Sequence, residues 1–228
     1  MLLPFDELPE EFHNDAVKKY YDILITKKRS IIVKRIFDIA VSVLFIIILL
    51  IPIIILALAV KLTSKGPVLY KQVRVTTYNR EFKILKFRTM VENADKIGAL
   101  VTSEGDSRIT KVGHFLRKYR LDELPQVFNV LKGDMSFVGT RPEVPKYVKR
   151  YTPVMYATLL MPAGITSLAS IKFKNEDKML GASTNIDDDY INIILPKKMH
   201  YNILYIKSFG FKNDLYLMGK TFKEVLFH

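Results

Sequence analysis

The sequence predicts an α/β (α-rich) fold in which a membrane-embedded helix precedes a compact domain that contains a small β-hairpin. Three observations predict this fold. An uncharged apolar run covers residues 39–60, two alternating segments rich in β-forming residues follow at 68–75 and 81–87, and helical patterns dominate the rest. With 228 residues, 49% of them hydrophobic, the chain is long enough for one globular core and an appendage.

Residues 1–30 are the first of three predicted regions, an amphipathic N-terminal extension. Apolar residues recur at helical spacing from residue 8 to residue 29, where the segment ends in basic residues. This pattern predicts one amphipathic helix, which could lie on a membrane surface or pack on the domain. The sequence leaves both options open.

The second region, residues 31–61, is built around a run without a charge from Ile39 to Val60. A straight helix of this length would measure about 33 Å, enough to span a bilayer. A soluble core helix would show a polar face at helical spacing, and this run shows none, so we expect it in lipid. Pro52 lies near its middle and cannot donate to the carbonyl of Ile48, which predicts a bend.

Basic residues flank the apolar run on both sides, and they bear on its topology. If both flanks follow the positive-inside tendency, both ends lie in the cytoplasm and the helix is re-entrant, with its break at Pro52. An ordinary kinked transmembrane helix is the alternative, and these residues do not separate the two. The basic residues are Lys27, Lys28, Arg29, Lys34 and Arg35 before the run, and Lys61, Lys65, Lys71 and Arg74 after it.

The third region, residues 62–228, is predicted to be a compact domain in which several amphipathic, interfacial helices follow the hairpin. Asp122 is a suitable N-cap for a helix through Leu131, and Gly133 would end that helix. Further helices are expected near residues 143–151, 188–206 with a break at Pro196, and 214–227.

The adjacent carboxylates Asp122 and Glu123 stand in a basic and apolar stretch, R-K-Y-R-L-D-E-L-P-Q. In isolation, Asp122 would cap a helix and Glu123 would occupy its first turn. Carboxylates among fixed cations are also what a phosphoryl-transfer site needs, because the cations balance the phosphate oxygens. The nearby cations are Arg117, Lys118 and Arg120 around the pair, Lys83, Lys86 and Arg88 upstream, and Arg141 in a Gly- and Pro-defined turn downstream.

The formal net charge of +12 favours partners that carry phosphate, such as nucleotides, nucleic acid or an anionic membrane surface. A nucleic-acid binder is disfavoured because the sequence shows no helix-turn-helix or zinc-finger pattern. A basic, membrane-anchored binding or scaffold protein without catalysis stays as the alternative. Cysteine is absent and the four histidines are scattered, which excludes a disulfide framework and zinc-type spacing.

Five segments carry a wider pattern: K-R-I-F-D (34–38), G-P-V-L-Y-K-Q (66–72), K-F-R-T-M (86–90), the stretch from T-K-V-G-H-F to G-T-R-P-E (110–143) and G-I-T-S (164–167). In this order they resemble the monotopic phosphoglycosyl transferases, also called bacterial sugar transferases or undecaprenyl-phosphate sugar phosphotransferases. The similarity covers roughly residues 31–210, which makes it far more specific than one short motif.

This resemblance implies an enzyme that moves a sugar-1-phosphate from a nucleotide diphosphate sugar, expected to be a UDP-sugar, to polyprenyl (undecaprenyl) phosphate. It implies Asp122 as the nucleophile, with a covalent phosphosugar intermediate, and Glu123 as a ligand of Mg²⁺. The implied location is the cytoplasmic face of the bacterial inner membrane, where glycan or exopolysaccharide synthesis begins. The lipid bilayer is a further implied partner, whereas the sequence leaves the oligomeric state, including a homodimer, open. The residues expected to bind substrate are Lys86, Arg88, Arg141, Arg120 and Pro142.

The resemblance also implies a re-entrant helix broken at a proline, which favours that topology over the spanning one. In these proteins a serine often precedes the proline, whereas this chain has Ile51. Thr140-Arg141-Pro142 stands where the family has Pro-Arg-Pro, and 162–167 reads P-A-G-I-T-S where the family has P-G-I-T-G. We interpret these last two changes as possible donor contacts, so the sugar and the base stay unassigned.

Overall fold

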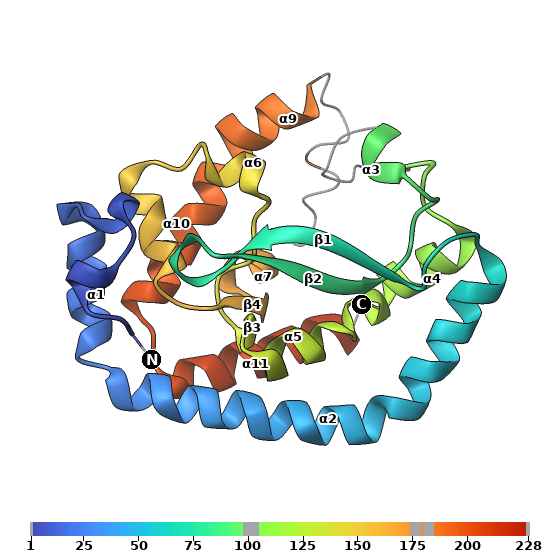
Figure 1. Cartoon of the computed structure of the whole chain (residues 1–228), viewed down its shortest axis with the longest axis horizontal. Helices are drawn as coiled ribbons and strands as arrows, with labels where there is room; N and C mark the ends of the chain where they lie inside the picture. Colours follow the sequence, from blue (N-terminus) through green and yellow to red (C-terminus); the bar gives the residue numbers. More distant parts are fainter. Residues whose placement is uncertain (1, 98–104, 174–178, 180–184, 227–228) are drawn as a thin grey trace.

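The computed structural model describes residues 2–97, 105–173, 179 and 185–226 (Figure 1). Within this part of the chain the structure is mostly helical and contains two separate two-stranded sheets. One very long helix runs along an edge of the molecule, and the hairpin lies near its centre (Figure 1). The predicted α-rich fold with a small hairpin is therefore confirmed.

The N-terminal segment consists of two 3₁₀ turns, η1 (Phe5–Glu7) and η2 (Glu10–Phe12), followed by helix α1 (Asp15–Ile25). The prediction of one helix over residues 8–29 was too long. Asn14 is extended and its side chain accepts from the Val17 amide at 3.0 Å, so it caps a helix that can begin only after it. The sequence left open whether this segment lies on a membrane surface or packs on the domain. In the structure it packs on the domain.

Helix α2 (Lys28–Thr63) contains the apolar run and is the helix, within the described residues, that is long and apolar enough to cross a membrane. Pro52 lies inside it. The predicted break is a bend and not an interruption, since α2 stays helical and changes direction in its C-terminal half (Figure 1). A proline removes one backbone hydrogen bond and clashes with the preceding turn, which bends a helix without ending it.

Both halves of α2 contact the same domain. In the N-terminal half, Arg35 donates to the carbonyls of Val130 and Leu131 at 2.7 and 2.9 Å. In the C-terminal half, Val60 is buried in a cluster with Phe87 and Leu116. The bend therefore lets one helix pack at two separated places on a single body.

The predicted hairpin is confirmed. Strands β1 (Leu69–Val75) and β2 (Glu81–Phe87) pair antiparallel, with Leu69 opposite Phe87 and Val75 opposite Glu81. The 3₁₀ turn η3 (Thr77–Asn79) joins them, and Tyr78 and Asn79 both take positive φ in that turn. Because side chains alternate along a strand, Tyr70, Gln72 and Arg74 share one face of the hairpin with Lys86.

A second, parallel pair joins β3 (Met135–Val138) to β4 (Ala163–Thr166), and the sequence did not predict it. Next to this pairing, the backbones at Gly139 and Gly164 approach each other closely. A Cβ atom on Gly164 would lie 2.2 Å from the Gly139 nitrogen, so both glycines are required for this contact. All four residues of β3 are buried, so their burial does not alternate as it does along a half-buried strand.

Short helices and turns complete the domain, and two of them test the predicted helix ends. Gly133 has φ of 93° and ends α5, as predicted. The expected break at Pro196 is a π-helical turn, η6, that runs directly into α10, where the proline occupies the first turn. The elements are α3 (Ala94–Ile97), α4 (Lys111–Lys118), η4 (Leu121–Glu123), α5 (Gln126–Lys132), α6 (Pro145–Val148), η5 (Pro153–Leu159), α7 (Leu168–Lys172), α9 (Ile186–Asp189), η6 (Tyr190–Ile194), α10 (Leu195–Lys207) and α11 (Phe211–Leu226).

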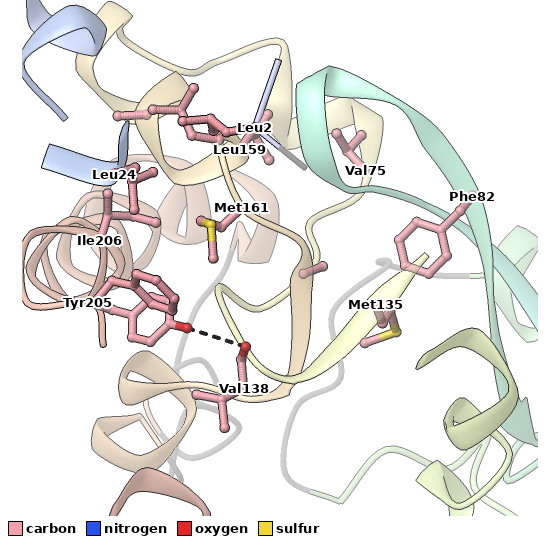
Figure 2. Close-up of a cluster of buried hydrophobic side chains, with 14 of the residues drawn as sticks. Leu2, Leu24, Val75, Phe82, Met135, Val138, Leu159, Met161, Tyr205 and Ile206 are labelled. Carbon is pink, nitrogen blue, oxygen red and sulfur yellow. Dashed lines mark hydrogen bonds between the residues drawn. The ribbon is translucent and has the colours of Figure 1, made fainter. Parts of the chain in front are cut away.

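One hydrophobic core joins segments from both ends of the chain. Figure 2 shows Leu24 of α1 beside Ile206 of α10, with Met135 and Phe82 farther along the same cluster. The hydroxyl of Tyr205 donates to the Val138 carbonyl at 3.4 Å and links α10 to β3 (Figure 2). The N-terminal extension is thus part of the main core.

Candidate active site

Asp122 and Glu123 lie in the 3₁₀ turn η4, between α4 and α5. The prediction that Asp122 caps a helix was wrong. Hydrogen bonds from the Glu123 amide to the Arg120 carbonyl and from Leu124 to Leu121 keep the aspartate inside the turn, and α5 begins only after Pro125. Neither η4 nor α5 has a side-chain capping hydrogen bond at its first residues. The Asp122 carboxylate therefore does not accept a capping bond from a backbone amide of these elements.

Three of the predicted substrate-binding cations surround the Glu123 carboxylate. The Lys86 ammonium on β2 donates to Oε1 at 3.0 Å. An Arg141 guanidinium nitrogen lies 3.8 Å from the same oxygen, and one of Arg120 lies at 4.0 Å. These residues come from three separate parts of the sequence, so the fold gathers them at one place.

The charge state of Glu123 follows from these neighbours. Burial by itself would raise the pKa of Glu123. The charges of Lys86, Arg141 and Arg120, with the Lys86 hydrogen bond, outweigh burial and lower the pKa to about 2. Glu123 is therefore ionised at any physiological pH, and its negative charge holds the cations in place.

Asp122 has a different environment although it is the next residue. Its side chain is buried, and burial raises its pKa above the ordinary value, with a further contribution from the Glu123 charge. Lys86, Arg117 and Arg120 act in the opposite direction. Helix capping does not occupy this carboxylate, so burial and the surrounding charges determine its protonation state.

Backbone contacts with β4 place the turn that carries Arg141. The Gly139 amide donates to the Thr166 carbonyl at 3.1 Å, and the Gly164 amide donates to the Thr140 carbonyl at 2.8 Å. Pro142 is buried, and its carbonyl accepts from Arg74 at 3.0 Å. Pro142 therefore lies beside the cation cluster as part of the scaffold of this turn.

Arg88 is the predicted site residue that the structure does not bring to the carboxylates. Its guanidinium donates to the Ser64 carbonyl and hydroxyl, both at 2.7 Å, to the Val60 carbonyl at 3.4 Å and to the Pro67 carbonyl. These groups are at the C-terminal end of α2, where the last carbonyls have no partner inside the helix. Arg88 thus caps α2, only two residues beyond Lys86.

The two departures from the family pattern have internal uses. The Thr140 hydroxyl donates to the Thr158 carbonyl at 3.1 Å and is buried. The Ser167 hydroxyl accepts from the Ser170 amide at 2.8 Å and caps α7. The interpretation of these positions as donor contacts is not supported by this geometry, because both hydroxyls are turned into the protein.

Arg74 was assigned from the sequence only to the basic membrane flank, whereas in the structure it contacts the turn that carries Arg141. Its guanidinium donates to Gln72 at 2.6 and 2.9 Å as well as to Pro142. The signal that could have found it is the strand alternation, which puts Arg74 on the same hairpin face as Lys86.

The site offers two adjacent carboxylates to a metal ion. Within the described residues there is no group of three or more His, Cys, Asp or Glu that could enclose one. Mg²⁺ is commonly held by one or two carboxylates, with substrate phosphates and water completing its shell. Asp122 and Glu123 fit that mode of binding.

Comparison with known proteins places this geometry in a family. The family model for bacterial sugar transferases matches residues 29–228. A UDP-N-acetylgalactosamine-undecaprenyl-phosphate N-acetylgalactosaminephosphotransferase of Aeromonas hydrophila is 39% identical over 174 residues, 75% of this chain and 38% of that protein. A UDP-glucose:undecaprenyl-phosphate glucose-1-phosphate transferase of Klebsiella pneumoniae is 37% identical over 197 residues, 84% of this chain and 40% of that protein.

A Bacillus subtilis relative, the uncharacterized sugar transferase EpsL, is 33% identical over 195 residues, 86% of this chain and 88% of that protein. The chain thus spans about two fifths of the Aeromonas and Klebsiella proteins and most of EpsL. The family match includes α2, the hairpin and the carboxylate pair, and it confirms the resemblance found in the motifs. The chain belongs to the bacterial sugar transferase family.

Proposed function

We propose that this protein transfers a sugar-1-phosphate from a UDP-sugar to a polyprenyl phosphate and releases UMP. The observation that carries the proposal is the Glu123 carboxylate with Lys86, Arg141 and Arg120 all within 4.0 Å of one oxygen, next to the buried Asp122. The cluster carries more positive than negative charge, which suits a diphosphate. Family membership and the undecaprenyl-phosphate acceptors named for two relatives support the same reaction.

Asp122 is the proposed nucleophile. A carboxylate oxygen attacks the phosphorus that bears the sugar, a new P–O bond forms, and the bond to UMP breaks with its electron pair leaving on UMP. An oxygen of the polyprenyl phosphate then attacks the same phosphorus. That step breaks the bond to Asp122, forms the lipid diphosphate sugar and restores the carboxylate.

The cations have to offset the repulsion between an anionic nucleophile and an anionic diphosphate. In this proposal Lys86 and Arg141 contact the phosphate oxygens while Glu123 anchors them, as its contacts with both residues support. Mg²⁺ held by Glu123 would add charge neutralisation at the diphosphate. We therefore expect Glu123→Gln to impair the Mg²⁺-dependent reaction in two ways. The variant would bind the metal more weakly, and it would no longer anchor Lys86 and Arg141.

The acceptor explains why such a site would sit at a membrane. A polyprenyl phosphate keeps its chain in the bilayer, so the reacting phosphate is available only at the interface. Helix α2 is apolar over most of its length and lies mostly outside the core, which suits insertion into lipid. We propose a location at the cytoplasmic face of the bacterial inner membrane, in the first membrane step of glycan or exopolysaccharide synthesis; a homodimer stays a prediction.

The proposal is tested by intact-protein mass spectrometry. The protein is mixed with Mg²⁺ and a panel of UDP-sugars without lipid acceptor, and Asp122→Asn serves as the matched variant. We expect a mass gain of one phosphosugar with a particular donor, absent in the variant, because the amide is a poor nucleophile.

Two results would contradict the proposal at different levels. UMP release that requires polyprenyl phosphate, without a mass gain, would replace the covalent route by direct transfer. No UMP release with any donor in the presence of the lipid, from a protein that is folded, would overturn the transferase function.

A further inference from the structure

A buried ion pair that the proposed reaction does not use lies two residues beyond Arg141. The side chains of Glu143 and Lys198 are each 3% exposed, and their charged atoms are 3.2 Å apart. The Tyr190 hydroxyl donates to the same Glu143 oxygen at 2.7 Å and accepts from the Lys198 ammonium at 2.7 Å. Glu143, Tyr190 and Lys198 thus form a closed buried triangle, called the Glu143 triangle below.

The Glu143 triangle joins the site to a distant part of the chain. Tyr190 follows Glu143 by 47 residues in sequence and begins the π-helical turn η6, and Lys198 lies in α10. Short π-helical turns inside longer helices occur frequently at functional sites. Here the turn presents the Tyr190 hydroxyl to Glu143.

Strand β1 also holds this segment, and the charge of Arg74 acts on Glu143 as well. The Val75 amide donates to the Glu143 carbonyl at 2.9 Å, and Arg74 donates to the Pro142 carbonyl at 3.0 Å. Residues 141–143 are therefore held both by β1 and by the unit formed by η6 and α10. Arg141 is the residue of this segment whose side chain approaches Glu123, at 3.8 Å.

Stability alone is a weak reason for such a triangle. Burying two charges has a large desolvation cost, and a hydrophobic replacement of a buried ion pair is often as stable or more stable. What an ion pair with a hydroxyl adds is directional geometry, since each hydrogen bond has a preferred distance and angle. The location next to Arg141 gives that geometry a use.

We propose that Glu143, held by Tyr190 and Lys198, is a positioning residue that orients Arg141 for the transferred phosphate. This inference rests on the proposed function for its catalytic consequence. Tyr190 and Lys198 act through Glu143 and do not touch substrate. Without the Glu143 triangle, the Arg141 guanidinium would spend less time within hydrogen-bonding distance of the transferred phosphate. Small misplacements of a charged donor have large effects on rate.

The primary variant is Tyr190→Phe, because it removes one hydroxyl and keeps the buried ring. Tyr147→Phe is the matched control: Tyr147 stacks on Tyr190 with ring centres 4.5 Å apart, but its hydroxyl donates to Asp187 at 2.7 Å and not to Glu143. We expect Tyr190→Phe to lower kcat about tenfold, with Tyr147→Phe close to the unsubstituted protein.

A double-variant cycle with Arg141→Ala separates positioning from a general loss of structure. If Tyr190 acts through Arg141, Tyr190→Phe has little further effect on kcat once Arg141 is gone. A tenfold effect that persists in the Arg141→Ala background would overturn the inference, since effects that add are typical of independent sites.

A second readout does not depend on the reaction. Because the chain contains no cysteine, Arg141→Cys introduces a single thiol on the turn. We expect Tyr190→Phe to raise its rate of maleimide labelling by about tenfold, and Tyr147→Phe to leave the rate unchanged. Equal labelling in both variants would overturn the positioning role, whereas raised labelling in a protein that transfers no phosphosugar would place the failure in the proposed function.

Discussion

Asp122 and Glu123 are adjacent residues with opposite electrostatic environments. Burial raises the pKa of Asp122, whereas the cations around Glu123 lower its pKa to about 2. The difference fits the separate roles that the family resemblance implies for the two carboxylates. Glu123 is a fixed anion that organises cations, and Asp122 is the proposed nucleophile, whose reactivity would depend on its protonation.

The first prediction concerns the acid side of the pH–rate profile for UMP release. Asp122 must be ionised to attack, and its pKa is raised, so kcat/KM should fall as pH drops through that pKa; Glu123 should not contribute near neutrality. Lys86→Met removes a charge that favours the ionised form of Asp122, which moves the acid limb to higher pH. An acid limb at the same pH in both proteins would show that Asp122 does not control it.

The second prediction separates Arg88 from Lys86, which lies two residues earlier on the same hairpin. Arg88→Met removes the donor that caps α2, so the protein should lose stability, by about 1.5–3 kcal/mol for a charged hydrogen-bond donor. The fraction that stays folded should keep its KM for the UDP-sugar. Thermal unfolding in detergent and donor titration measure the two effects, with Lys86→Met as the comparison; a raised KM with unchanged stability would return Arg88 to the substrate site.

At the scale of elements, α2 is the helix through which we propose that the domain meets the membrane. Its N-terminal half is tied to α5 through Arg35, and its C-terminal half is tied to β2 and α4 through Val60, Phe87 and Leu116. A single folded body cannot lie on both sides of a bilayer. On this ground we propose that α2 is re-entrant and does not span the membrane.

The third prediction tests that topology with single cysteines at exposed positions, one at the start of α2 and one just beyond its end. Lys28→Cys and Lys65→Cys should both react with a membrane-impermeant maleimide from the cytoplasmic side of sealed vesicles, because both residues are exposed and lie near the domain. Intact and inverted vesicles provide the two sides. Labelling of the two positions from opposite sides would establish a spanning helix and exclude the re-entrant one.

At the scale of the whole molecule, the N-terminal extension is part of the main core although the family match begins at residue 29. Phe12, Val17 and Leu24 are all fully buried there. The extension also reaches the hairpin, since the Leu3 amide donates to the Tyr78 hydroxyl at 2.9 Å. It therefore supports the hairpin that carries Lys86.

The fourth prediction is that the protein loses stability when the packing of the N-terminal extension in the main core is weakened. Leu24→Ala should lower the free energy of unfolding by about 2–5 kcal/mol, the usual range for a buried leucine. Lys19→Ala, on an exposed position of the same helix, should change it little. Denaturant unfolding in detergent measures both, and equal small effects would mean that the extension is not part of the cooperative core.

Local patterns in the sequence determined several features by themselves. The apolar run determined α2, the alternation determined the hairpin, and Gly133 determined the end of α5, because each signal depends on neighbouring residues and backbone geometry. The carboxylate pair with Lys86, Arg120 and Arg141 was also recognisable as a set from the family motifs.

Only the tertiary structure decided how distant residues meet. The pairing of β3 with β4, the capping of α2 by Arg88 and the Glu143 triangle all join segments separated by many residues, and no local pattern encodes such contacts. The failed cap at Asp122 has the same origin. A carboxylate that would cap an isolated helix is instead held in a turn between packed elements, where burial and nearby cations determine its chemistry.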